Sequence, residues 1–172
     1  MKPLATAAIL AILLTLTACG GGSGGRTTVP PASKYPDSNV EFVDADKLFP
    51  LLDRAKEEDK LVFVDFYTSW CTPCKMMDKD VFTDNKAATF MNANFINYKV
   101  DAENGNGVNL AGLYEVQVYP TLLLLDGDGN IMARSDRALY PTQLIAFGKK
   151  GLKKYKAQKA ANSSAATTPR QR

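Results

Sequence analysis

The chain has 172 residues, of which 45% are hydrophobic and 23% are charged, and its formal net charge is +3. These values are typical of one soluble globular domain with a hydrophobic core. The sequence contains no histidine, which excludes the commonest general base, the usual pH switch and a frequent zinc ligand.

Residues 1–18 have the layout of an export signal, with Lys2 before an apolar run that ends at Leu16. The run is short for a membrane-spanning helix, which needs about 20 apolar residues. The ending "LTAC" resembles a bacterial lipobox, which implies cleavage before Cys19 and attachment of a lipid to its sulfur. A plain secretory signal, or a membrane anchor with an incidental cysteine, is the alternative interpretation.

The segments that flank the expected domain differ from it in composition. Residues 19–39 are rich in Gly, Ser, Thr and Pro, which predicts a flexible tether. Residues 160–172 predict an unstructured tail, so the folded domain is expected over residues 40–159. The chain from Arg137 onward has nine Lys or Arg and no acid. Attraction to an anionic membrane surface is one explanation, and a solvated helix face is the favoured one.

Helices and strands alternate within this domain. A first helix is expected over residues 46–59, with Asp46 as its N-cap and Pro50 in its first turn. The run "LVFVDFY" at 61–67 predicts a buried strand. Further helices are expected at 72–80, 85–94, 107–115 and 141–159, and further strands at 95–101, 121–126 and 131–135. This order predicts an α/β fold with a central mixed sheet of four or five strands, flanked by helices.

Cys71 and Cys74 lie in the segment "SWCTPCK", directly after the first strand. Cys71 is expected at a helix N-terminus, where unpaired N–H groups and the helix dipole lower a thiol pKa below its free value of about 8.5. Cys74 lies one turn further on, and it is expected to be more buried and to act as the resolving thiol. Pro73 suits the first helical turn. If Cys19 carries a lipid, the two remaining cysteines have only each other as partners.

Other uses of this cysteine pair are less well supported. Attachment of a c-type haem requires a histidine after the second cysteine, where Lys75 stands. A closed zinc site requires four ligands, and the chain has neither a second cysteine pair nor a histidine. A structural disulfide remains open, although closing so short a loop stabilises a fold little. Redox exchange is therefore favoured, with no metal and no organic cofactor.

The segment "VDFYTSWCTPCK", followed about fifty residues later by "YPTLLLLDGDGN", resembles the active-site segments of the thioredoxin family. The resemblance is closest to thioredoxin-like domains on exported lipoproteins and on the periplasmic end of transmembrane thiol:disulfide reductases. It implies a thioredoxin fold over nearly the whole predicted domain.

The resemblance also implies roles for two residues outside the cysteine pair. Asp65 matches the buried acid that assists proton transfer at the resolving cysteine, and burial should raise its pKa. A side chain that reaches a solvated edge is the alternative. Pro120 matches the cis-proline that faces the cysteines and leaves its neighbouring backbone free to pair with an extended substrate. An ordinary trans proline is the alternative.

Four more residues are expected to contact substrate. Trp70 and Pro73 match the family, with a packing role as the alternative for Trp70. Thr72 stands where thioredoxin has Gly, and Tyr119 stands where thioredoxins usually have Ile. Both differences should affect redox potential and substrate choice. The family's lysine beside the buried acid is not matched in the expected register, because Asn97 takes its place and Lys99 lies two residues further on.

The resemblance implies a thiol:disulfide oxidoreductase that reduces disulfides of exported proteins. We expect it to be lipid-anchored in a bacterial cell envelope, facing the periplasm and supplied by a membrane thiol-reducing donor. A monomer that binds no nucleic acid is expected. A disulfide oxidase or isomerase, or a non-redox peptide-binding module that resembles a chaperone, is the alternative.

Overall fold

The structure is a computed structural model that describes residue 35 and residues 37–167. The expected signal segment, the lipid-bearing Cys19 and almost all of the expected tether therefore lie outside the described residues, as do residues 168–172. None of the helices in the described part of the chain is both long enough and apolar enough to span a bilayer.

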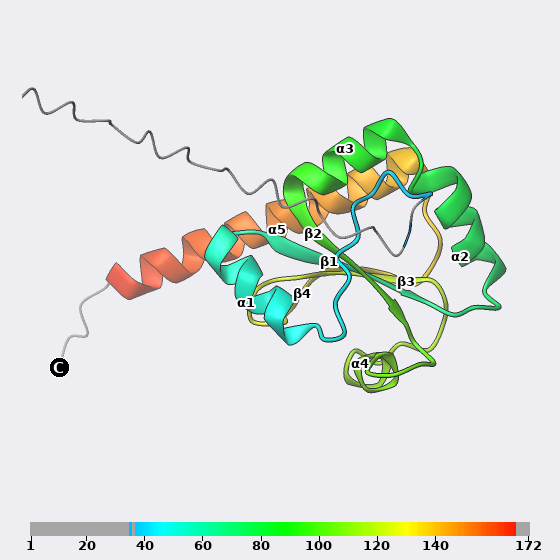
Figure 1. Ribbon diagram of the computed structural model, residues 1–172. Helices are drawn as coiled ribbons and strands as arrows, with labels where there is room; N and C mark the ends of the chain where they lie inside the picture. Colours follow the sequence, from blue (N-terminus) through cyan, green and yellow to red (C-terminus); the bar gives the residue numbers. More distant parts are fainter. Residues whose placement is uncertain (1–34, 36, 168–172) are drawn as a thin grey trace, which may run out of the picture. The chain divides into compact units, whose positions relative to one another are not determined.

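A mixed sheet of four strands forms the centre of the domain (Figure 1). The strands are β1 (Leu61–Tyr67), β2 (Phe95–Asp101), β3 (Thr121–Leu125) and β4 (Ile131–Ser135), in the order β2-β1-β3-β4. Strand β1 is parallel to β2 and antiparallel to β3, and β3 is antiparallel to β4. Every residue of β3 is buried, which explains its uninterrupted apolar sequence. The predicted mixed sheet is thus confirmed.

Helices cover both faces of the sheet (Figure 1). They are α1 (Phe49–Glu58), α2 (Thr72–Met76), its π-helical continuation η1 (Met77–Val81), α3 (Asn85–Asn94), α4 (Gly107–Leu113) and α5 (Pro141–Thr167). One core cluster joins η1, α3 and α5 to alternate strand residues such as Phe63. A second cluster joins α1 and α4 to the strand residues that alternate with those of the first cluster, such as Val62 and Val64. This period of two is what a sheet buried on both faces requires.

The first helix begins later than the sequence predicts. Its N-cap is Leu48 and not Asp46, and no side chain caps it. Leu48 is fully buried, and its carbonyl accepts hydrogen bonds from the N–H groups of Leu51 and Leu52 at 2.9 and 3.1 Å. Burial of this leucine in the core fixes the start of the helix. Pro50 lies in the first turn, as expected.

The described structure continues past both expected ends of the domain. Helix α5 continues through Thr167, past the expected end at Lys159, because the alanine-rich segment that follows favours helix. The Lys159 ammonium also lies 2.5 Å from a carboxylate oxygen of Asp59. At the other end, Tyr35 belongs to the expected tether, yet its ring packs edge-on against Phe42 with centroids 5.4 Å apart.

Candidate active site

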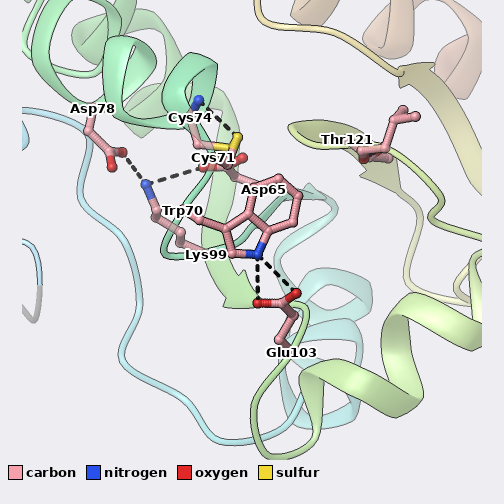
Figure 2. Close-up of a disulfide and its surroundings, with 9 residues drawn as sticks. Asp65, Trp70, Cys71, Cys74, Asp78, Lys99, Glu103 and Thr121 are labelled. Atoms are coloured by element: carbon pink, nitrogen blue, oxygen red, sulfur yellow. Dashed lines mark hydrogen bonds and ion pairs between the residues drawn. A yellow bond between two sulfur atoms is a disulfide. The ribbon is translucent and has the colours of Figure 1, made fainter.

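The two cysteines form a disulfide at the start of α2 (Figure 2). Cys71 is the N-cap residue, with an extended backbone at φ −68° and ψ 103°, and the helix begins at Thr72. The Cys71 Sγ accepts a hydrogen bond from the Cys74 N–H at 3.1 Å. In the reduced protein, this N–H and the helix dipole favour the Cys71 thiolate over the thiol. The expected position at a helix N-terminus is confirmed.

Burial does not distinguish the two cysteines in this oxidised form. Cys71 and Cys74 are each 2% exposed, so the expectation that Cys74 is the more buried one is wrong here. The residues around them are open to solvent: Thr72 and Pro73 are exposed, and Trp70 is 62% exposed. These three side chains are therefore accessible from solvent beside the disulfide.

The loop before β3 reaches the segment that carries the cysteines. The Tyr119–Pro120 peptide bond is cis, as the family resemblance implied. The Tyr119 ring meets the Trp70 ring edge-on, with centroids 5.9 Å apart. Because Trp70 directly precedes Cys71, this contact brings the proline loop beside the disulfide. The two aromatic rings together form one rim of the site.

Glu103 also contacts the Trp70 ring, through a hydrogen bond (Figure 2). The Trp70 Nε1–H donates to both carboxylate oxygens of Glu103, each at 3.0 Å. Glu103 lies in the loop after β2, whose first turn is fixed by the Asp101 side chain. Sequence reasoning missed Glu103, because its only relation to Trp70 is spatial.

Asp65 is buried in the surroundings of the disulfide (Figure 2). It is 1% exposed, and its Oδ1 has no hydrogen-bond partner within the described residues. Burial raises the pKa of Asp65 from 3.8 to about 6; the nearby Lys99 ammonium lowers it, and Asp78 raises it. A carboxyl that titrates near neutral pH can accept and return a proton during turnover.

The lysine beside this acid is Lys99, and the sequence prediction of its register was wrong. Parallel pairing places Lys99 directly opposite Asp65, whereas Asn97 is opposite Phe63. Asn97 and Lys99 lie on the same face of the sheet, so the register alone decides that Lys99 and not Asn97 meets the acid. The Lys99 Nζ lies 3.4 Å from the Asp65 Oδ2.

Asp78 is a further site residue that sequence reasoning missed. It lies on η1, its carboxylate contacts the Lys99 ammonium, and its side chain is 47% exposed. The chain of groups from Asp65 through Lys99 to Asp78 therefore connects the buried acid to solvent (Figure 2). In the sequence, the feature that could have identified Asp78 is its position four residues after Cys74, on the same face of a continuing helix.

Comparisons with known proteins agree with this arrangement. The family model Thioredox_DsbH, described as a protein of unknown function, DUF255, matches residues 40–119. The thiol:disulfide interchange protein DsbD of Pseudomonas sp. (strain JR1 / K1) is 28% identical over 147 residues, which are 77% of this chain and 25% of that protein. Thioredoxin H4 of Arabidopsis thaliana is 39% identical over 74 residues, which are 43% of this chain and 58% of that protein.

A solved structure is also similar over the domain. It is that of a candidate disulphide-isomerase from Bacteroides thetaiotaomicron, with a TM-score of 0.59 and 39% sequence identity. The match covers 67% of this chain and 94% of that one. By contrast, the chain spans only a quarter of the length of the Pseudomonas DsbD. The fold, the cis-proline, the paired cysteines and these similarities together show that the chain belongs to the thioredoxin family.

Proposed function

We propose that this chain is a thiol:disulfide oxidoreductase that acts through Cys71 and Cys74. The observation that carries the proposal is the disulfide at the N-terminus of α2, with a buried acid in its surroundings. The names of the DsbD and thioredoxin relatives support it.

The reaction starts from the reduced protein. The Cys71 thiolate attacks one sulfur of a substrate disulfide, and the other substrate sulfur leaves as a thiolate that takes a proton from water. A mixed disulfide then joins Cys71 to the substrate. The Cys74 thiol gives its proton to the Asp65 carboxylate, and the Cys74 thiolate attacks the Cys71 sulfur. The second substrate sulfur leaves as a thiolate and takes the proton from Asp65, which returns to its carboxylate form. The substrate gains two electrons and two protons, and the protein becomes the disulfide form.

The direction of exchange that we propose is reduction of disulfides in exported proteins. The Trp-Cys-x-Pro-Cys-Lys pattern supports a reductant, and the segment before residue 20 supports export with a lipid on Cys19. A reductant in an oxidising compartment needs electrons, so a membrane thiol-reducing protein is the proposed donor. Residues 40–159 remain the proposed catalytic core of a bacterial envelope protein that faces the periplasm.

Equilibration with glutathione buffers tests the direction. Reductase function requires a Cys71–Cys74 potential near the thioredoxin value of about −270 mV, and a value near −120 mV would identify an oxidant instead. Reduction of insulin, with dithiothreitol as the source of electrons, tests the activity itself. The Cys71→Ser and Cys74→Ser variants are the controls, and equal activity in wild type and Cys71→Ser would refute the proposal.

Disulfide isomerisation is the second candidate function. It is favoured by the 39% identity to the Bacteroides thetaiotaomicron protein. The measurement is recovery of activity from scrambled ribonuclease. An isomerase needs Cys71 but tolerates Cys74→Ser, whereas a reductase loses multiple turnover in both variants.

A further inference from the structure

A cavity lies at the free edge of the sheet, away from the residues that carry the exchange chemistry. It is open to solvent, its volume is about 560 Å³, and it is bordered by the end of β4, the loop after it and the first turns of α5. Its lining side chains include Asp136, Arg137, Leu139, Phe147 and Lys150.

This cavity opens at the end of the sheet that carries the disulfide. Thr121 directly follows Pro120, and its Oγ1 donates to the Oδ1 of Asp136 at 3.1 Å. Strands β3 and β4 are antiparallel, so the start of β3 and the end of β4 lie at the same end of the sheet. Two strand spacings of about 4.8 Å separate β1 from β4, so β4, which borders the cavity, lies roughly 10 Å from β1.

The cavity has a positive rim. Its one acid, Asp136, accepts a hydrogen bond from the Arg134 Nε at 2.8 Å, and Arg134 uses its other nitrogens on carbonyl oxygens at the end of α4. Asp136 is therefore already neutralised. Arg137 and Lys150 remain exposed, and neither has an ion-pair partner among the described residues. Both cations are available to an anion.

Two apolar side chains also line the cavity. Leu139 is 5% exposed and Phe147 is 9% exposed, and both side chains line the cavity. A ligand that combines methylene groups with a carboxylate satisfies both parts of the site. The methylenes pack against Leu139 and Phe147, and the carboxylate pairs with Arg137 and Lys150. A glutamate side chain has this chemistry.

We propose that this cavity binds an acidic side chain of the polypeptide substrate, about three residues from the cysteine that Cys71 attacks. The spacing follows from geometry, because an extended chain rises about 3.3 Å per residue and covers roughly 10 Å in three residues. The inference rests on the proposed exchange function and adds a substrate preference to it. The cavity thereby selects acidic polypeptide segments for exchange at Cys71.

Matched peptides test the preference. Each peptide has a central cysteine in a mixed disulfide with 2-mercaptoethanol, and carries Glu, Gln or Lys three residues before and after that cysteine. The reduced full chain should cleave the Glu peptide with a kcat/KM roughly three- to tenfold above that of the Lys peptide, since solvated ion pairs contribute modestly to binding. High salt should reduce this ratio.

Charge reversal identifies the cavity as the cause. The double variant Arg137→Glu and Lys150→Glu should prefer the Lys peptide. The matched control is Lys153→Glu with Lys156→Glu, which makes the same change in net charge at exposed positions of α5 outside the cavity lining. The control should keep the Glu preference. Retention of the preference in the cavity variant, or its loss in both variants, would overturn the inference.

A neutral small disulfide separates failure of this inference from failure of the proposed function. Bis(2-hydroxyethyl) disulfide carries no side chain that could reach the cavity, so wild type and both variants should reduce it equally. If wild type does not reduce it, the exchange function is wrong. If wild type reduces it but cleaves all three peptides at equal rates, the function stands and the acidic subsite is refuted.

Discussion

Asp65 on β1 and Lys99 on β2 are partners in register, and the Lys99 Nζ lies 3.4 Å from a carboxylate oxygen of Asp65. Both side chains are almost fully buried, at 2% and 1% exposure. The aromatic rings of Tyr35, Phe42, Tyr67 and Phe82 surround the ammonium at 4.8 to 5.8 Å from their centroids. The Asp65–Lys99 ion pair therefore lies in an apolar environment. A change in a neighbouring charge has a large effect on the proton affinity of Asp65 in such an environment.

Replacement of Asp65 by Asn should change how stability depends on pH. The folded-state pKa is about 6 and the ordinary value is 3.8. The protonated acid thus favours the fold at low pH, and this stability is lost as the pH rises from about 4 through 6. Asp65→Asn cannot ionise, so its stability relative to wild type should increase by about 2 kcal/mol between pH 4 and pH 7. Urea denaturation at both pH values measures this.

The exposed Asp80 provides the control for that measurement. The Asp80→Asn variant should follow the wild-type pH dependence. A constant stability difference between wild type and Asp65→Asn from pH 4 to pH 7 would show that Asp65 has no raised pKa in the folded protein.

Replacement of Asp78 by Asn should shift the proton-transfer step to lower pH. The negative charge of Asp78 raises the pKa of Asp65, so its removal should lower that pKa below about 6. The rate at which Cys74 resolves the mixed disulfide should then reach its plateau at a lower pH than in wild type. Rapid-quench measurement of the mixed disulfide from pH 4.5 to 8 shows the shift. A profile that moves to higher pH would exclude this electrostatic role.

The Cys71 thiol should be unusually acidic in the reduced protein. The Cys74 N–H donates to the Cys71 sulfur at the start of α2, so the Cys71 pKa should lie below the free value of about 8.5. Alkylation by iodoacetamide across a pH series, read by peptide mass spectrometry, measures both cysteines separately. Cys74→Ser keeps the same N–H and should leave the Cys71 pKa low. Titration of Cys71 at the value of free cysteine would contradict the proposed nucleophile.

Glu103 should position the Trp70 ring over the substrate-facing side of the site. Glu103→Leu removes both acceptors of the indole N–H, whereas Glu103→Gln keeps one acceptor oxygen. The KM for a peptide disulfide should be several-fold higher in the Leu variant than in wild type, with little change in the KM for a small disulfide. The Gln variant should have a peptide KM close to that of wild type. Trp70 is the only tryptophan, so its fluorescence anisotropy reports ring mobility directly. Unchanged anisotropy in Glu103→Leu would refute this role.

The local features of this protein were determined by short stretches of sequence. The strand 61–67, the helix start after Cys71 and the helix 85–94 each follow from residues within one or two turns of the position concerned. Apolar periodicity and turn chemistry act over that range, so the α/β order was predictable. The cis-proline followed from the family resemblance, since composition alone does not specify it.

The neighbours of the buried acid were decided only by the tertiary structure. Lys99 faces Asp65 because of the β1–β2 register, and a shift of that pairing by two residues had favoured Asn97. Asp78 reaches Lys99 from another element, and Glu103 reaches Trp70 across 33 positions of the chain. Strand register and packing between elements depend on the whole core, which no single segment encodes. The sequence therefore identified the candidate reacting groups, and the fold determined which charges surround them.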